Sequence, residues 1–365
     1  MHFIFFILCF FISFLYSSPT IQELSTEEKI GQLFVICFDG QSMNEEVIDL
    51  LQTIQPGGII YYNYLNGLSS PEQVNRLSRQ LNDYALSHSP FLPFFLCVDQ
   101  EGGQVTRLKE GFSDLPSAQK IGSLNKRSMI ENYARTTAKE LLDVGINVNL
   151  APVLDLQAKQ KNTRSYSADP LRVAEIAEII LASFNKEGLL GCLKHFPGHG
   201  SVETDSHEAL PVLRKSLTQL EREDMLPFLK VLNKASFIMP AHILCQAIDP
   251  DNCVTLSKIF LTDLLRKKLS FQGVIISDSL TMQGVLTQTK SLESAALRAF
   301  QAGCDILLLG GKKLNEEGKK DYLSKEEIKA VKERLLQAVI KKEITQERLD
   351  ESVERIIHLK KMLKR

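Results

Sequence analysis

The 365-residue chain lacks an excess of charge of either sign, since 43 Lys and Arg residues face 44 Asp and Glu residues and the formal net charge is -1. Without a basic excess, the chain lacks the electrostatic footprint of a protein that wraps nucleic acid. The low net charge and the hydrophobic share of 44% also exclude a mostly disordered chain. We expect a globular protein that buries a large core without disulfides or metal ions.

Long apolar runs are also scarce, and the single one covers residues 3–16, interrupted only by Ser13. A membrane protein with several spans is therefore excluded. The run is short for a transmembrane helix and predicts the apolar part of a signal peptide, followed by Ser17 and Pro19. We expect residues 1–18 to direct export to the periplasm or the medium. An uncleaved anchor that tethers the chain to a membrane, or a cytoplasmic location, is the alternative.

The seven cysteines include no C-x-x-C pair, which argues against structural zinc and against a redox dithiol. Four of them lie in or beside short apolar runs, where a thiol usually serves as a small buried hydrophobe: Cys37, Cys97, Cys192 and Cys304. Cys245 and Cys253 flank one loop, and whether they pair in an exported chain stays open.

Short apolar segments recur along the chain and alternate with longer amphipathic ones. The predicted strands cover 34–38, 58–62, 94–98, 147–154, 191–195, 236–241, 273–277 and 305–309. They are apolar on both faces, as expected of parallel strands covered by helices. The clearest predicted helices cover 71–87, 129–143, 170–187 and 292–302, and Pro71 and Pro170 suit a first helical turn.

About eight such β-α units without a break in composition predict an α/β fold, a single-domain TIM-type (β/α)8 barrel over residues 19–365. No glycine-rich phosphate fingerprint follows the first strand, which counts against a dinucleotide-binding sheet. Helical patterns run from Ser324 to the end of the chain. Two apolar stripes are predicted there, one of Leu336, Val339 and Ile340 and one of Leu349, Val353, Ile356 and Ile357.

Chemically capable side chains follow four of the predicted strands. The third strand runs into 98–107, which reads VDQEGGQVTR, and the fifth into 194–200, which reads KHFPGHG. The sixth ends in 239–242, MPAH, and the seventh in 277–279, SDS. Because catalysis in such barrels takes place at the carboxyl ends of the strands, we expect these carboxylates, imidazoles and cations to meet at one rim.

Asp278 follows the apolar run 274–276, so its carboxylate should point into the mouth of the barrel. A dry carboxylate beside cationic groups stays ionised and can act as a nucleophile. The alternative is that Asp278 caps a following helix, since Asp is a good N-cap residue. Spacing alone leaves both interpretations open.

Asp205 precedes His207 by two residues, in a loop that opens with PGHG at 197–200. An Asp in this place can accept a hydrogen bond from the imidazole and fix its tautomer, so the pair could act as general acid and base. A surface loop with an incidental histidine is the alternative.

The histidines His195, His199 and His207 raise the question of a metal site. Pro197 and two glycines break any helix between them, so their spacing does not resemble a helical zinc pair. We therefore expect no metal.

Asp99 and Arg107 share the end of the third strand and its loop, and Arg164 follows the fourth strand. A carboxylate there can bind two hydroxyl groups of a ligand, and a guanidinium can bind an anionic or amide oxygen. The alternative for Asp99 and Arg107 is a mutual ion pair across the turn at 102–103. Arg164 has the same two interpretations.

Three of these segments resemble a known family. The segment 194–207, KHFPGHGSVETDSH, resembles the signature of the bacterial β-N-acetylhexosaminidases in glycoside hydrolase family 3. The segment 99–107, DQEGGQVTR, is similar to that family's D-x-E-G-G-x-V-x-R motif, and 277–282, SDSLTM, resembles its nucleophile motif. The resemblance runs from about residue 24 to the last helix, with the motifs in the same order.

The resemblance implies roles position by position. Asp278 matches the nucleophile that forms a covalent glycosyl-enzyme, His207 the acid/base, and Asp205 its orienting partner on a mobile loop. The candidate residues for holding the terminal N-acetylglucosamine are Asp99, Arg107, Arg164, Lys194 and His195, to which we add Met239 at the end of the sixth strand. Retaining glycosidases usually employ two carboxylates. We expect an imidazole in the acid/base role here, because near neutral pH it readily gives and takes a proton.

The implied activity is that of a retaining exo-β-N-acetylglucosaminidase that acts on peptidoglycan fragments without a metal or organic cofactor. The expected partner is then a small carbohydrate or muropeptide, not nucleic acid, and we expect a monomer. Phosphorolysis, a β-glucosidase activity or, outside enzymes, a non-catalytic wall-binding barrel stays open. The chain has no tryptophan, a common platform for sugars, but a pocket for one sugar needs it less than a long cleft does.

Overall fold

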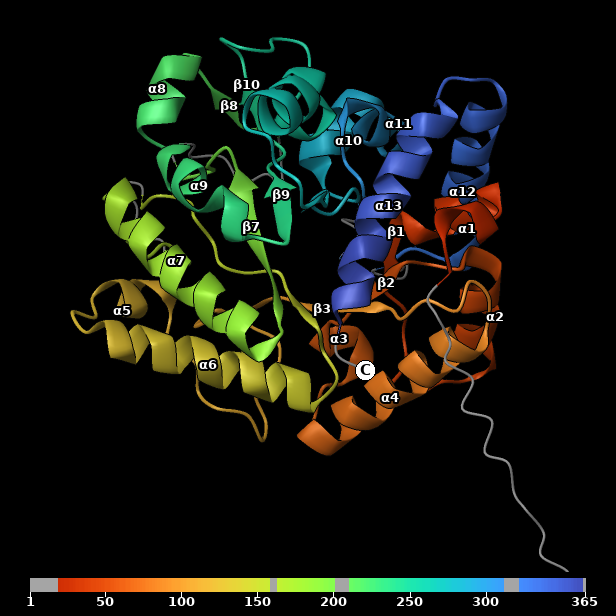
Figure 1. The fold of residues 1–365 in the computed structure, drawn as a ribbon, viewed down its shortest axis with the longest axis horizontal. Coiled ribbons are helices and arrows are strands. Elements are labelled where there is room, and N and C mark those ends of the chain that lie inside the picture. The colour runs from red at the N-terminus through yellow and green to blue at the C-terminus, as the bar shows by residue number, and fades with distance from the viewer. Residues whose placement is uncertain (1–18, 158–162, 201–209, 312–321, 364–365) are drawn as a thin grey trace, which may run out of the picture.

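The computed structural model describes residues 19–157, 163–200, 210–311 and 322–363 (Figure 1). The expected leader, residues 1–18, lies outside them. In the described part of the chain, no helix combines the length and the apolar character that crossing a bilayer requires.

Eight parallel strands form the central sheet, and each lies within or overlaps one of the eight predicted segments. They are β1 (Phe34–Ile36), β2 (Gly58–Ile60), β3 (Phe95–Val98), β6 (Val148–Asn149), β7 (Leu190–Phe196), β9 (Phe237–Pro240), β11 (Val274–Ile275) and β12 (Leu307–Leu309). Their order in the sheet is β11-β9-β7-β6-β3-β2-β1-β12. Every residue of these strands is buried except His195, which is half-buried. The strands are buried because helices cover the outer face of the sheet and packed side chains fill its interior.

The sheet curls until its two edge strands meet, but their seam is short. One isolated bridge, between Ile276 and Ile306, joins the β11 side to the β12 side. Backbone hydrogen bonds from Asp305 and Ile306 to the carbonyl oxygen of Ile275 support it. The expected regular barrel is therefore found as a curled parallel α/β sheet whose last pair of strands is joined over a few residues.

Two small sheets lie outside the central one. The strands β4 (Gln100–Gly102) and β5 (Val105–Thr106) form an antiparallel pair directly after β3. The strands β8 (Val212–Leu213) and β10 (Leu244–Cys245) pair in parallel.

Helices follow most of the strands and surround the sheet in Figure 1. The α-helices are α1 (Thr26–Gln32), α2 (Glu45–Ile54), α3 (Asn63–Asn66), α4 (Pro71–Ser87), α5 (Ala118–Gly122), α6 (Arg127–Asp143), α7 (Pro170–Glu187), α8 (Leu217–Arg222), α9 (Leu226–Val231), α10 (Gln283–Thr289), α11 (Leu292–Ala302), α12 (Lys325–Ile340) and α13 (Gln346–Met362). Shorter or irregular turns are η1 (Ile21–Glu23), η2 (Leu232–Lys234), η3 (Val254–Leu256) and the π-helical η4 (Ile259–Lys268). As predicted, Pro71 and Pro170 open α4 and α7, after the capping side chains of Ser70 and Asp169.

The last two helices test the predicted stripes. Leu349, Val353, Ile356 and Ile357 of α13 are all buried, as predicted. The stripe predicted on α12 is wrong, because Ile340 is 63% exposed and the buried face consists of Ile328, Val331, Leu335 and Ala338. Leu336 and Val339 lie at the margin of that face.

The six cysteines within the described residues are free, buried thiols, and this includes Cys245 and Cys253. The structure therefore contains no disulfide between these two residues. Burial raises the pKa of each of the two thiols to about 12, so both stay protonated and unreactive near neutral pH.

Candidate active site

The predicted site residues within the described chain lie at the carboxyl ends of the strands. Asp99 follows β3, Lys194 and His195 belong to the end of β7, and Asp278 follows β11. Met239 lies opposite Lys194 in the pairing of β9 with β7 and is 1% exposed. Paired strand residues point to the same face of a sheet, so Met239 packs beside Lys194 in the wall below the rim. Its contact with a substrate stays a prediction.

A network of ion pairs at this rim joins β4, which carries Glu101, and the end of β7, which carries Lys194, to the segments that follow β3, β5 and β6. The Nζ atom of Lys194 lies 2.7 Å from Oδ1 of Asp99 and 2.7 Å from Oε1 of Glu101. Arg164 donates two hydrogen bonds to the carboxylate of Glu101, from Nε and from one terminal nitrogen, each 2.8 Å long. Arg107 approaches Oδ2 of Asp99 at 3.5 Å. Three cations thus share two carboxylates, and the polar heads of Lys194 and Arg164 are each held by two contacts.

The network keeps its carboxylates ionised. Burial by itself raises the pKa of Glu101, but the charges of Lys194 and Arg164 outweigh it and hold this pKa at about 2. For Lys194, burial lowers the pKa, and the neighbouring Asp99 and Glu101 more than reverse this. The ion-pair interpretation is confirmed for Arg107, which pairs with Asp99, and Arg164 pairs with Glu101. Binding of a ligand by these two arginines stays a prediction.

Asp155 fixes His195 from below. Its Oδ2 lies 2.7 Å from Nδ1 of His195, and its Oδ1 accepts hydrogen bonds from the backbone amides of His195 (3.1 Å) and His199 (2.7 Å). Burial acts to raise the pKa of Asp155, but His195 outweighs it and holds this pKa far below its usual range. A carboxylate only accepts hydrogen bonds, so Nδ1 of His195 carries a proton and donates it to Asp155.

Asp278 is half-buried beside these groups. Its Oδ1 accepts a 2.7 Å hydrogen bond from the backbone amide of Ser279. Burial would raise the pKa of this carboxyl, yet the neighbouring His195 and His242 hold it below its usual value, together with the Ser279 amide and Lys194. Asp278 is therefore ionised near neutral pH, as a nucleophile must be. The alternative role as helix cap is wrong, because the next helix, α10, begins at Gln283 and follows Met282.

His242 supports the backbone next to Asp278. The imidazole is completely buried, with Nε2 2.9 Å from the carbonyl oxygen of Ser279 and Nδ1 2.8 Å from the hydroxyl of Thr255. A carbonyl oxygen only accepts, so Nε2 carries a proton and donates it to Ser279. The residue after Asp278 is thereby tied to the end of β9.

Glu101, Asp155 and His242 had no role in the sequence-based site. Asp155 directly follows the predicted strand 147–154, and Glu101 and His242 lie in segments that follow the third and sixth strands. The expectation that functional side chains follow the carboxyl ends of strands could have selected all three. Their hydrogen-bond partners, in contrast, come from distant segments and needed the fold.

Asp205 and His207 fall outside the described residues, and their roles stay predictions. Among the residues that the structure does describe, no three His, Cys, Asp or Glu side chains are grouped as a metal site. His195 in particular directs Nδ1 to Asp155.

Comparisons with known proteins agree with this arrangement. Residues 25–359 match the family described as glycosyl hydrolase family 3 N terminal domain. The chain belongs to glycosyl hydrolase family 3. Among relatives of this family-3 chain, a beta-hexosaminidase of Idiomarina loihiensis is 35% identical over 276 residues, which cover 74% of this chain and 81% of that protein. A beta-hexosaminidase of Pseudomonas aeruginosa is 34% identical over 74% of this chain and 80% of its own length.

Solved structures of family 3 superpose closely on this chain. A beta-N-acetylglucosaminidase from Paenibacillus sp. str. FPU-7 has a TM-score of 0.85 and 32% identity over 93% of this chain, which spans 62% of that longer one. A beta-N-acetylhexosaminidase from Beutenbergia cavernae has a TM-score of 0.78 and 25% identity over 93% of this chain and 99% of its own. This family-3 chain is therefore a glycoside hydrolase, with its charged rim at the place where such enzymes do their chemistry.

Proposed function

We propose that this glycoside hydrolase is a retaining exo-β-N-acetylglucosaminidase that removes terminal N-acetylglucosamine from peptidoglycan fragments. The observation that carries the proposal is the environment of Asp278, an ionised carboxylate beside His195 and Lys194 at the carboxyl end of the curled sheet. The names of the relatives, beta-hexosaminidase and beta-N-acetylglucosaminidase, support the choice of sugar. We interpret the sheet as a TIM-type (β/α)8 barrel.

The proposed reaction has two steps. A carboxylate oxygen of Asp278 attacks the anomeric carbon, while the bond to the leaving oxygen breaks and that oxygen takes a proton from His207. Water then attacks the same carbon, His207 accepts the proton of the water, and the sugar leaves Asp278. Asp205 orients His207 in both steps. Two inversions at one carbon retain the β configuration.

The ion-pair network prepares the site for the sugar. Asp99, Lys194, Arg107 and Arg164 hold their polar atoms in place before a substrate arrives. Preordered hydrogen-bonding groups lose little entropy on binding, and this favours a small, polar ligand such as a single sugar. We also propose that residues 1–18 direct export, which would bring the enzyme to peptidoglycan.

Replacement of the nucleophile tests the proposal. Wild type should release 4-nitrophenol from 4-nitrophenyl N-acetyl-β-glucosaminide faster than from the β-glucoside. The Asp278→Asn variant should lose activity by on the order of a thousandfold or more. Asp263→Asn is the matched control, because Asp263 forms an exposed ion pair with Lys267 on η4 and should leave the rate unchanged.

Trapping with a 5-fluoro glycosyl donor should label the peptide that contains Asp278, and nuclear magnetic resonance should detect the β-anomer as the first product. An Asp278→Asn protein with the rate of wild type would contradict the assignment. Formation of sugar 1-phosphate with added phosphate, at the expense of hydrolysis, would replace the hydrolase by a phosphorylase.

A further inference from the structure

Tyr62 occupies the rim beside the ion-pair network and has no role in the site described so far. It follows β2 directly and is 7% exposed. The guanidinium carbon of Arg107 lies 5.7 Å from the centre of its ring, and the ring of Tyr64 lies 5.3 Å away. The preceding Tyr61 directs its hydroxyl outward to Ser78 on α4. Successive residues of an extended chain point to opposite faces, so Tyr62 points into the curled sheet.

The hydroxyl of Tyr62 lies close to the segment that carries Asp278. Gly311 separates the two, since a Cβ atom placed on this glycine would lie 3.6 Å from Oη of Tyr62 and 3.1 Å from Oγ of Ser279. The φ angle of +116° at Gly311 also favours glycine. The space between the two hydroxyl groups is thus kept free of a side chain.

Oη of Tyr62 makes no hydrogen bond to any residue in the described ranges, although the side chain is almost fully buried. Burial, reinforced by the charge of Asp99, raises the pKa of Tyr62 well above its ordinary value. The phenol therefore stays protonated and offers a donor at the rim. Oη is not one of the fully buried polar atoms that lack a partner, so it reaches the open mouth of the sheet, where a polar group of a ligand can accept its hydrogen bond.

The strand order fixes how a sugar would lie. The strand β3, which precedes Asp99, and β11, which precedes Asp278, are four places apart among eight strands, so the two carboxylates face each other across the mouth. Lys194 spans this distance, because it pairs with Asp99 and also lowers the pKa of Asp278. A pyranose with its anomeric carbon at Asp278 then directs its fourth carbon toward Asp99.

The two remaining walls differ in charge. The wall formed by β6 and β7 carries the three cationic or imidazole side chains of Lys194, His195 and Arg164. The wall formed by β2, β1 and β12 presents Tyr62 and Gly311 at its strand ends, with the single guanidinium of Arg107 beside the Tyr62 ring. A pyranose has a matching asymmetry. One edge carries two polar substituents, on carbons 2 and 3, and the other carries the ring oxygen and the exocyclic hydroxymethyl group.

We propose that Tyr62 is a further specificity-determining residue, whose hydroxyl donates a hydrogen bond to the exocyclic hydroxymethyl oxygen of the terminal sugar. The inference deepens the proposed function and rests on it. The edge with two polar substituents faces the charged wall, and the hydroxymethyl edge faces Tyr62.

The test compares two substrates, the 4-nitrophenyl β-glycosides of N-acetylglucosamine and of its 6-deoxy analogue. With wild type, loss of the 6-hydroxyl should lower kcat/KM by about 3- to 10-fold, the worth of one hydrogen bond. Tyr62→Phe should lose the same factor with the normal substrate and nothing further with the 6-deoxy substrate. Tyr61→Phe, which removes a buried hydroxyl on the opposite side of the chain, should leave both rates unchanged.

Each other outcome counts against the inference. Equal losses of Tyr62→Phe with both substrates would mean that the hydroxyl acts elsewhere, and no loss with either would mean that it binds nothing. A wild type that hydrolyses both glycosides equally well would overturn the inference without any variant, while leaving the proposed function intact. A wild type that hydrolyses neither would overturn the proposed function itself.

Discussion

Glu101 is the residue on which two of the sugar-binding candidates depend. Its carboxylate is 5% exposed and receives Arg164 through two hydrogen bonds and Lys194 through an ion pair. Because Lys194 belongs to β7 and Arg164 to the segment that follows β6, one carboxylate between them sets their relative position. Glu101 is a positioning residue in this arrangement, since Lys194 also reaches Asp99 and so transmits the effect to the rim.

We therefore predict that Glu101→Gln raises KM and lowers kcat/KM for an N-acetyl-β-glucosaminide by about 10- to 100-fold, because displaced binding groups lose contact with the sugar. Steady-state kinetics would measure both constants. Glu131→Gln is the matched control, since the exposed ion pair of Glu131 with Arg127 contributes at most about 1 kcal/mol. A Glu101→Gln enzyme with the KM of wild type would contradict the positioning role.

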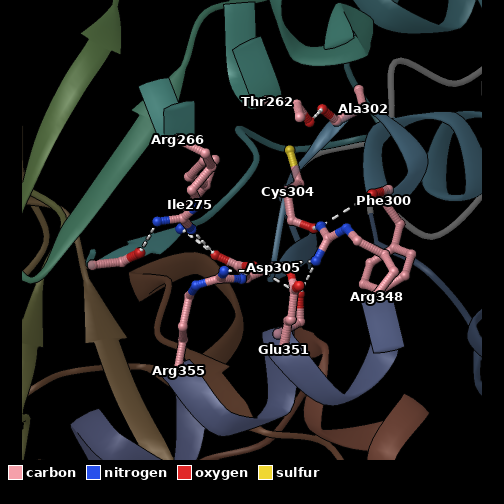
Figure 2. Close-up of polar contacts among 12 residues, drawn as sticks. Thr262, Arg266, Ile275, Phe300, Ala302, Cys304, Asp305, Arg348, Glu351 and Arg355 are labelled. Atoms are coloured by element: carbon pink, nitrogen blue, oxygen red, sulfur yellow. Dashed lines mark hydrogen bonds and ion pairs between the residues drawn. The ribbon is translucent and has the colours of Figure 1, made fainter. Parts of the chain in front are cut away.

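The helix α13 is tied by ion pairs to the sheet, at the end opposite to the rim. Figure 2 shows Asp305, just before β12, surrounded by Arg348 and Arg355 from α13 and by Arg266 from η4. Asp305 is completely buried, and its Oδ1 accepts a 2.7 Å hydrogen bond from Ser352. Burial acts to raise the pKa of Asp305, but the arginines outweigh it and keep this pKa below its usual value.

The same cluster supports the seam of the sheet. Oδ2 of Asp305 accepts a 2.9 Å hydrogen bond from the backbone amide of Ile275, and its backbone amide donates to the carbonyl oxygen of that residue. Arg266 contacts both Asp305 and the carbonyl oxygen of Gly273, directly before β11. The side chain of Asp305 thus reinforces the short junction between β11 and β12.

We predict that Asp305→Asn lowers the free energy of unfolding by about 3–5 kcal/mol, because it leaves buried guanidinium charges without their carboxylate. Unfolding in urea would measure the loss. The kcat of the remaining folded enzyme should stay close to that of wild type, since Asp305 pairs with Ile275 and the three arginines and not with the groups around Asp278. Glu351→Gln should cost no more than about 1 kcal/mol, because Glu351 is 59% exposed and its nearest contact to Arg355 is 3.5 Å. Equal stabilities of the two variants would contradict the account.

In the whole molecule, the charged groups at one end of the sheet form the candidate active site, and those at the other end affect stability. The carboxyl ends of the strands carry the network around Lys194, and the amino ends are closed by α13. There Lys360 points inward, with Nζ 2.7 Å from Oε1 of Gln32 and 5.3 Å from the centre of the Phe95 ring. Burial lowers the pKa of Lys360 to about 7, opposed only weakly by Cys97.

This lysine makes stability depend on pH. An unfolded lysine titrates near 10.4, so between about pH 7 and pH 10 the unfolded chain binds more protons than the folded one. The free energy of unfolding then rises with pH over this window, by up to about 1.4 kcal/mol per pH unit. Below pH 7 the folded protein carries the full cost of a buried charge.

We predict that Lys360→Met removes this contribution. The variant should be more stable than wild type at pH 6, and the difference should shrink steadily up to pH 10. Thermal or urea unfolding across this range would measure it. Lys361→Met, at the exposed neighbouring position, should follow the pH dependence of wild type. A constant difference between Lys360→Met and wild type would show that the lysine is charged throughout.

The sequence by itself determined the local structure and much of the chemistry. Apolar runs located all eight strands, because strands covered on both faces must be apolar throughout. Pro71 and Pro170, each after a capping side chain, marked two helix starts because both signals act within one turn. Asp99, Lys194, His195 and Asp278 could also be selected from the sequence, because each lies at the end of an apolar run that marks a strand.

The tertiary structure decided which of these groups meet. Lys194 is linked to Glu101, and Asp155 to His195, across 93 and 40 positions of the chain, and no local pattern encodes such a pairing. The burial of α12 was also decided by its neighbours, because α1, α2 and α11 cover a face next to the stripe that periodicity favoured. The tertiary structure also separates the charged groups of the rim, at the carboxyl ends of the strands, from the stabilising cluster around Asp305 at the amino ends. All strands of the central sheet run in one direction, so charges after each of these strands gather at one end and charges before each of them at the other.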